Sequence, residues 1–195
     1  RVAQFSATSY VEDQDMVRLS GIFSDIAVVA RPDGGIDDCV VMADYDPITG
    51  RGSLDVRVTS TAEVTVRLDG RPLPLGTTDV GPVDPWSAES PRLYELVVST
   101  ASETVTCRVG FRRIEISDGL LRINGSPMRF RGVNRHDTDA DHGRTVTPEQ
   151  VRADLLAMKR AHLNAVRTSH YPPLPYLLDV ADEIVVLADA KVEQV

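Results

Sequence analysis

The spacing of the apolar residues changes once along this 195-residue chain, and that change constrains the fold more than any other feature. Up to about residue 110, apolar and polar residues alternate with a period of two, which is typical of half-buried β-strands. The segments that alternate in this way are "SLDVRV" (53–58), "EVTVRL" (63–68), "LYELVV" (93–98) and "TVTCRV" (104–109). Short strands about ten residues apart, separated by turn residues, predict a β-sandwich. The segment 18–32 is expected to be the final strand of a preceding region, and it leads to a linker at 32–35.

A different pattern begins near residue 120. The segment "LRINGSPMRF" (121–130) predicts a hairpin, because Asn124 and Gly125 both tolerate the positive φ that its turn requires. A strand is expected over 128–134. Thr147 then starts a helix as its N-cap, since Pro148 suits the first helical position and Gln150 completes a capping box.

The rest of the chain continues this alternation of strands and helices. "LNAVRTSH" (163–170) predicts a strand, 173–182 a short helix, and "IVVLADA" (184–190) a third strand. The order strand, helix, strand, helix, strand predicts the start of a parallel α/β domain, most simply a (β/α)₈ barrel. About two and a half of the eight units are present, so we expect an incomplete barrel that cannot close within this chain.

Composition narrows the class of protein. The formal net charge is −8 and no basic stripe occurs, which argues against nucleic-acid and anionic-membrane partners. The apolar runs are too short to span a bilayer, and residues 1–20 lack the apolar core of a secretory signal. The chain does not begin with Met, so we expect a fragment or a processed product that could have lost a signal. Cys39 and Cys107 suit a reducing cytoplasm, the expected location, although one disulfide between two sandwich strands stays an alternative.

Polar residues lie at equivalent positions in the α/β region, at the carboxyl end of each predicted strand. The first strand ends in His136, the second carries Arg167 and ends in His170, and the third runs out near Glu193. In barrels of this type the functional groups lie just past the carboxyl ends of the strands, so these residues are candidates for one site. Each residue alone has a structural interpretation, as a loop histidine, a helix cap or an ion pair, but their shared position favours function.

The stretch "RGVNRHDTDADHGR" (131–144) raises the alternative of a metal site, because His136 and His142 lie among three aspartates. It lacks the Gly and the distant Glu of a calcium loop, and its histidine spacing is not a zinc signature. Ser169 beside His170 is not a catalytic dyad, because adjacent strand residues point in opposite directions. His162 falls on the apolar spacing of the predicted helix and is expected to pack there.

Five segments together resemble glycoside hydrolase family 2, and within it the lacZ-type bacterial β-galactosidases. They are "SYVEDQDMVRLSGIFSDIAVVARP" (9–32), "PWSAESPRLYEL" (85–96), "VGFRRIEI" (109–116), "GLLRINGSPMRFRGVNRHD" (119–137) and "NAVRTSHYP" (164–172). The resemblance implies that residues 1–32 are the C-terminal end of a jelly-roll sugar-binding domain. Residues 33–116 would form an immunoglobulin-like β-sandwich, and residues 117–195 the N-terminal part of a (β/α)₈ catalytic barrel.

The resemblance also implies an activity, the retaining hydrolysis of terminal β-D-galactosides such as lactose, and roles for three residues. His136 resembles a histidine that stabilises the transition state, His170 a second one, and Arg167 the arginine that orients the carboxylate of the nucleophile. The nucleophile and the acid/base of the family are glutamates on later strands, so we expect the chain alone to be inactive. A galactoside is the implied partner, and the family commonly forms homo-oligomers.

Mg²⁺ and Na⁺ are the ions that the resemblance implies, and this sequence departs from both sites. Glu193 matches a glutamate that binds magnesium, but Val195 stands where a histidine ligand is expected, and Ala7 replaces an aspartate that binds the sugar and sodium. Two residues are also missing near 182–184, and Asp137 replaces the usual glutamate. These departures keep two alternatives open: a non-catalytic carbohydrate-binding or interaction module, and a degenerate remnant of an enzyme.

Overall fold

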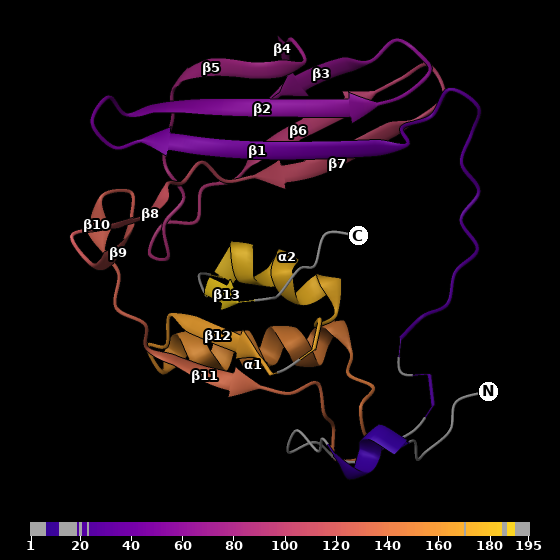
Figure 1. Cartoon of the computed structure of the whole chain (residues 1–195), viewed down its shortest axis with the longest axis vertical. Helices are drawn as coiled ribbons and strands as arrows, with labels where there is room; N and C mark the ends of the chain where they lie inside the picture. The colour runs from indigo at the N-terminus through magenta and orange to yellow at the C-terminus, as the bar shows by residue number, and fades with distance from the viewer. Residues whose placement is uncertain are drawn as a thin grey trace. The chain divides into compact units, whose positions relative to one another are not determined.

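The computed structural model describes residues 7–11, 19, 21–22, 24–169, 171–184 and 187–189. The chain divides into two compact units. One unit comprises Val29–Arg129, and the other comprises Arg1–Val28 together with Phe130–Val195. Figure 1 labels the helices and strands of both units. The boundaries expected after residues 32 and 116 stay predictions.

The unit Val29–Arg129 is built from two antiparallel sheets that face each other (Figure 1). One sheet has the order β1-β2-β5 and the other the order β4-β3-β6-β7. Their strands are β1 (Asp38–Asp46), β2 (Arg51–Thr59), β3 (Thr65–Leu68), β4 (Arg71–Leu73), β5 (Gly76–Pro82), β6 (Tyr94–Ser99) and β7 (Thr104–Val109). The predicted β-sandwich is therefore confirmed, although β1, β4 and β5 were not among the predicted strands.

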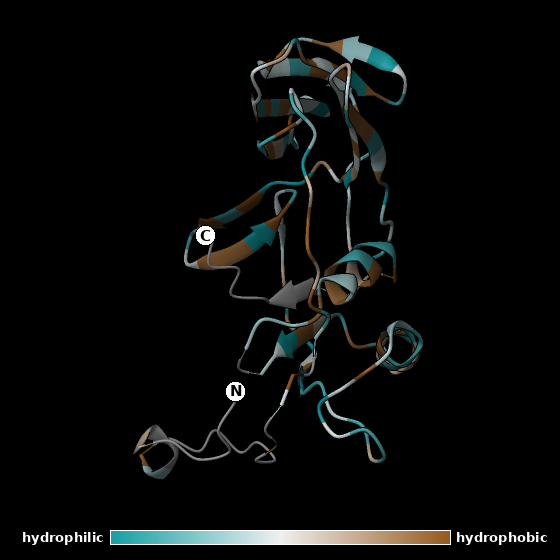
Figure 2. Cartoon of the chain, turned by 90° about the vertical axis from the view of Figure 1, so that its right-hand side faces the viewer, coloured by the Kyte–Doolittle hydropathy of each residue, from teal (hydrophilic) through white to brown (hydrophobic). Residues whose placement is uncertain are grey.

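The core of this unit lies between the two sheets because alternate side chains of each strand point inward. Leu54 and Val56 of β2 face Leu96 and Val98 of β6 across the core, and all four are at most 1% exposed. Hydrophobic and hydrophilic bands alternate along strands of this unit in Figure 2. Gly52 of β2 is required by this packing, since a Cβ there would meet the ring of Phe111 at 2.8 Å. Burial of each large side chain contributes about 1.5–3 kcal/mol before entropy is counted.

The predicted hairpin is confirmed as a small antiparallel sheet of β8 (Ile114–Ser117), β9 (Leu120–Ile123) and β10 (Ser126–Pro127). Asn124 and Gly125 form its turn with φ values of 52° and 77°, as a two-residue turn of this kind requires. The side chain of Asn124 also accepts a hydrogen bond from the Arg113 N–H at 2.9 Å and donates one to the Trp86 carbonyl at 3.0 Å. The turn residue therefore fastens this hairpin to the sandwich unit.

One predicted strand is wrong. Of the segment 18–32, expected to be a final strand, residues 24–31 form no strand in the structure, and residues 18, 20 and 23 lie outside the described residues. Ile26, Val28 and Val29 are 77%, 100% and 76% exposed, and no described segment pairs with them. A strand needs a neighbour to satisfy its N–H and C=O groups, so an apolar pattern alone does not create one. Before this segment, Ala7–Tyr10 forms a short 3₁₀ helix, η1.

The other unit contains a parallel three-stranded sheet with the order β11-β12-β13. Along the chain the elements are β11 (Gly132–Arg135), α1 (Pro148–Arg160), β12 (Ala165–Thr168), α2 (Pro175–Ile184) and β13 (Leu187–Asp189). The predicted order of strands and helices is confirmed, although β11 begins later than expected. That these strands are the start of an incomplete (β/α)₈ barrel stays a prediction.

Helix α1 begins and ends where local chemistry dictates. The Gln150 N–H donates to Thr147 Oγ1 at 3.3 Å and the Thr147 N–H donates to Gln150 Oε1 at 2.7 Å, which confirms the capping box. The helix ends at Arg160 with Ala161 as its C-cap, and His162 follows with a φ of 57°. His162 is exposed rather than packed on the helix, so that prediction is wrong, because the helix ends two residues before it.

Candidate active site

Helices α1 and α2 cover one face of the parallel sheet, and no described helix packs on the opposite face. Val166 of β12 is 1% exposed and packs with Val151 and Leu155 of α1 and with residues of α2. Arg135 of β11 points to the same side, since its Nε donates to Asp154 of α1 at 3.0 Å. Because side chains alternate along a strand, the residues between these positions lie on the opposite face.

Arg167, a predicted site residue, lies on that uncovered face. It is paired in register with Asn134 of β11 and with Asp189 of β13, and both Arg167 and Asn134 are exposed. Among the side chains that the structure describes, none forms an ion pair with the Arg167 guanidinium. A guanidinium that is always charged and presents a planar fork of donors is suited to bind a carboxylate or sugar hydroxyls.

His136 follows β11 directly and is half-buried. Its ring lies 6.1 Å from the ring of Tyr171, centroid to centroid, with the two planes tilted by 50°. The structure therefore brings His136 to the same carboxyl end of the sheet as Arg167. The other two predicted site residues, His170 and Glu193, lie outside the described residues.

A buried cluster of charges supports the segment that carries His136. The Arg135 side chain is 6% exposed, bonds the carboxylate of Asp137, which is 11% exposed, and also reaches Asp154. Asp137 and Arg135 flank His136 on both sides, so the cluster holds the backbone of that residue. A buried guanidinium with two carboxylate partners keeps its charge compensated, whereas loss of one partner would leave an uncompensated charge.

Tyr171 joins the segments that follow β11 and β12, and the sequence reasoning did not identify it. Its hydroxyl oxygen accepts a hydrogen bond from the Asp137 N–H at 2.8 Å, and the Arg144 guanidinium lies 4.8 Å from the centre of its ring. The Ser169 N–H also donates to the Arg135 carbonyl at 3.1 Å. These contacts link the two strand ends. The signal available in the sequence was the position of Tyr171 directly after "SH".

The hollow beside Tyr171 is small. It has a volume of about 30 Å³ and is lined by residues that include Asp137, Arg144 and Tyr171. That volume suits one water molecule and not a sugar ring. The uncovered sheet face, and not this hollow, is therefore the candidate for contact with a substrate.

The aspartate-rich loop after β11 is organised by Asp139. One of its carboxylate oxygens accepts from the backbone N–H groups of Asp141 and His142 at 2.9 and 2.8 Å, and lies 2.8 Å from His142 Nδ1. The backbone N–H of His142, followed by its ring, lowers the pKa of Asp139 below the ordinary carboxyl value. Among the residues that the structure describes, no three His, Cys, Asp or Glu side chains gather as a metal site. The Asp139 carboxylate is therefore already hydrogen-bonded within the turn. It also accepts a hydrogen bond from the side chain of Gln150.

Comparison with known proteins defines the class. The family model described as "Glycosyl hydrolases family 2" matches residues 47–112, and the one described as "Glycosyl hydrolases family 2, TIM barrel domain" matches residues 114–195. Both matches describe glycosyl hydrolases, and together they span most of the chain. The chain belongs to glycosyl hydrolase family 2, which confirms the predicted family.

Curated relatives carry the name β-galactosidase. The protein from Arthrobacter sp. (strain B7) is 43% identical over 94% of this chain and 19% of its own length. The protein from Actinobacillus pleuropneumoniae is 35% identical over 90% of this chain and 18% of its own length. The chain therefore spans about a fifth of the length of these relatives.

Similar solved structures include β-glucuronidases. The enzyme from Parabacteroides merdae is 28% identical with a TM-score of 0.65, over 79% of this chain and 23% of that chain. A β-glucuronidase from Ruminococcus gnavus has a TM-score of 0.72 at 24% identity, over 80% of this chain and 30% of that chain, and shows likeness of fold alone. Neither helix of the described part of the chain is long and apolar enough to cross a membrane.

Proposed function

We propose that this chain is one part of a retaining β-galactosidase, in which it supplies part of the site that holds the sugar. The observation that carries the proposal is the position of Arg167 on the uncovered face of the parallel sheet, with His136 at the same strand ends. The 43% identity to the Arthrobacter β-galactosidase supports a galactoside as the substrate over a glucuronide, because the β-glucuronidases are more distant.

In this proposal the three strands are the first strands of a (β/α)₈ barrel, and their uncovered face lines its interior. Polar residues at the carboxyl ends of barrel strands are where such enzymes place their chemistry. An exposed Asn134 and Arg167 on that face fit this arrangement, because a face that packed only against apolar groups would leave their donors unsatisfied.

Each residue has a role in the proposed mechanism. Arg167 orients the carboxylate of the nucleophile by charge-assisted hydrogen bonds, and His136 and His170 bind sugar hydroxyls as positive charge develops on the ring. Retention requires two carboxyl groups roughly 5 Å apart, a nucleophile and an acid/base. We expect these from barrel strands other than β11, β12 and β13, so the 195-residue chain alone is proposed to be inactive.

Mg²⁺ and Na⁺ belong to the proposal for the assembled enzyme only. The described residues do not fit either ion: no group of three ligands forms, and Ala7 offers no carboxylate. Glu193 stays the proposed magnesium ligand. No step of the mechanism is assigned to a metal, and a homo-oligomer in the cytoplasm is likewise part of the proposal.

A chimera tests the function. Residues 1–195 replace the matching segment of the Arthrobacter β-galactosidase, and hydrolysis of nitrophenyl β-D-galactoside and β-D-glucuronide is measured for the chimera and the isolated chain. We expect galactoside turnover by the chimera and none above the buffer blank by the chain. Arg167→Lys in the chimera should lower kcat by about 10²-fold or more, because a point charge replaces a bidentate fork.

The matched control is Arg160→Lys, since Arg160 is exposed at the end of α1 and should tolerate the change. Equal kcat values for the two variants would contradict the role of Arg167. A chimera that prefers the glucuronide would contradict the substrate. Turnover by the isolated chain would show that the nucleophile lies within it.

A further inference from the structure

The two cysteines of the chain lie on the outer strands of different sheets of the sandwich unit. Cys39 belongs to β1, which ends the sheet β1-β2-β5, and Cys107 belongs to β7, which ends the sheet β4-β3-β6-β7. Both are free thiols, both are half-buried, and both pack against the same hydrophobic core. Each therefore points inward, toward the space between the sheets.

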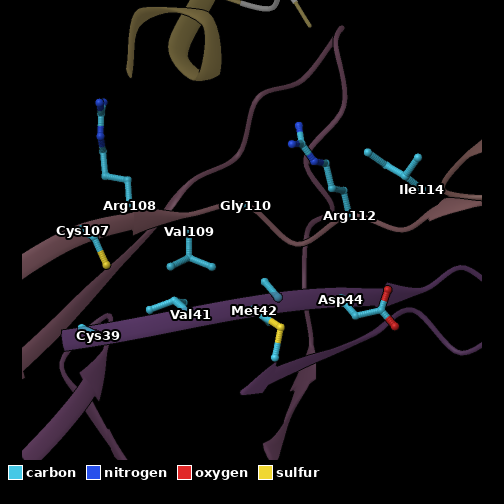
Figure 3. Close-up of a pocket in the computed structure, with 11 residues that line it drawn as sticks. Cys39, Val41, Met42, Asp44, Cys107, Arg108, Val109, Gly110, Arg112 and Ile114 are labelled. Carbon is cyan, nitrogen blue, oxygen red and sulfur yellow. The ribbon is translucent and has the colours of Figure 1, made fainter. Parts of the chain in front are cut away.

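The two thiols also line one groove. It has a volume of about 760 Å³, and its walls are the β1 segment that includes Val41 and Asp44 and the β7 edge that includes Val109. Figure 3 shows Cys107 directed from β7 toward β1, with Cys39 at the same end of the groove. Burial, and after it the negative charge of a Cys39 thiolate, raises the pKa of Cys107.

From this geometry we infer that Cys39 and Cys107 form a dithiol site, which small-molecule disulfides convert reversibly to an intrachain disulfide that joins the two sheets. A disulfide requires Cα atoms about 4.4–6.8 Å apart, closer than the roughly 10 Å between packed sheets. The outer edges of β1 and β7 are not hydrogen-bonded to another described strand, so these strands can approach without loss of ladder bonds. Sandwiches of the immunoglobulin type tolerate such an inter-sheet bridge.

The reaction is thiol–disulfide exchange and it balances without any other reactant. One cysteine thiolate attacks an oxidised glutathione molecule and forms a mixed disulfide, releasing one glutathione thiolate. The second cysteine thiolate then attacks the protein sulfur of that mixed disulfide, closes the Cys39–Cys107 bond and releases the second glutathione. Two protein thiols are oxidised, one glutathione disulfide is reduced to two thiols, and the two protons pass to the released thiolates or to solvent.

The rate should depend on pH in a definite direction. Burial raises the pKa of both thiols above the ordinary value, and for Cys39 the charge of Asp38 adds to this effect. Only the thiolate attacks, so the rate should rise about tenfold per pH unit while both thiols stay mostly protonated. The site is therefore slow at neutral pH and is expected to respond to sustained oxidation.

The experiment uses the folded 195-residue chain at low concentration with oxidised glutathione. Because the chain has two cysteines, a count of free thiols that falls from two to zero reports on this pair alone. We expect peptide mapping to give one cross-linked pair of peptides that contain Cys39 and Cys107, and we expect dithiothreitol to restore both thiols. The disulfide closes a loop of roughly 70 residues, so the oxidised chain should unfold at least about 5 °C higher.

Two variants serve as matched controls. Cys39→Ser and Cys107→Ser should each give only a glutathione adduct and no gain in unfolding temperature. Glutathione adducts on both cysteines of the parent chain would overturn the inference. So would covalent dimers whose yield rises with concentration, or an intrachain bond that forms only in denaturant.

Discussion

The two compact units bury their apolar residues in different ways. In Val29–Arg129, both sheets contribute to one core, and Leu54, Leu96 and Phe111 are at most 1% exposed. In the α/β unit, the helices cover one face of the sheet, and the other face presents Asn134 and Arg167 to solvent. In the sandwich unit each sheet covers the inner face of the other, and this apolar packing serves stability. The parallel sheet instead keeps a charged donor on the face opposite its helices, where it is available for binding.

The difference extends to the buried polar groups. The α/β unit buries Arg135, Asp137 and Ser169, and all three lie at the strand ends beside His136 or Arg167. In the sandwich unit the buried groups are mostly apolar, apart from Asp55. Buried charges cost free energy unless they are paired, so their concentration beside the candidate site indicates that rigidity is needed there.

The largest expected effect is in the sandwich core. Leu96→Ala removes a side chain that is 0% exposed and should lower the free energy of unfolding by about 4 kcal/mol, because transfer and cavity terms add. Trp86 is the single tryptophan of the chain and is 1% exposed, so its fluorescence follows the unfolding of this unit in denaturant.

Leu75→Ala is the matched control, since Leu75 is 48% exposed and its loss should cost less than about 0.5 kcal/mol. Similar losses for the two variants would show that the core is not packed around Leu96. The core between the two sheets would then not be what stabilises the sandwich unit.

The second effect tests the buried charges of the α/β unit. Arg135→Ala leaves the Asp137 carboxylate buried without its guanidinium and should cost about 3 kcal/mol. Because α1 and α2 lie in this unit, the measurement is the loss of helical circular dichroism in denaturant.

The control is Arg152→Ala, whose pair with Glu183 is exposed and should contribute less than about 1 kcal/mol. A loss for Arg135→Ala no larger than that for Arg152→Ala would contradict the proposed support of His136. The buried cluster would then be an incidental ion pair.

Sequence reasoning succeeded where the determining contacts are local. The capping box of α1 and the Asn124–Gly125 turn depend on residues a few positions apart, so their signals are complete in the sequence. Strand β1 was missed because "CVVMA" (39–43) is a run of apolar residues without alternation, and its structure depends on pairing with β2. The wrong strand over 24–31 shows the reverse case, an apolar pattern without a partner.

The candidate site divides in the same way. The positions of His136 and Arg167 follow from the strand order, because parallel strands bring their carboxyl ends to one edge of the sheet. Tyr171 could not be found in this way, since its hydrogen bond to the Asp137 N–H spans 34 residues and depends on how two loops approach. Nor does spacing show that Arg135 reaches Asp154 on a helix.

The smallest expected effect concerns an ion pair at the rim of the sandwich unit. Arg113 bonds both carboxylate oxygens of Asp44, with Nε 3.1 Å from Oδ1, and this hydrogen bonding lowers the pKa of Asp44 below its ordinary value of 3.8. A carboxyl whose pKa is lower in the folded state stabilises the fold at pH values above its ordinary pKa. That contribution is lost as the pH falls from about 4 through the folded-state pKa.

Asp44→Asn should therefore lower the free energy of unfolding at neutral pH and should make the loss of stability in acid less steep. Because the Asp44 side chain is 45% exposed, solvent screening limits the effect to about 1 kcal/mol or less. Trp86 fluorescence in denaturant at a series of pH values measures it, and Glu89→Gln, exposed in the turn 87–90, is the control. If Asp44→Asn and Glu89→Gln changed the acid slope equally, the pair would add nothing to the sandwich unit. If instead Asp44→Asn lowered the free energy of unfolding as much as Arg135→Ala, the difference in exposure would not explain why the charges of the two units contribute differently to stability.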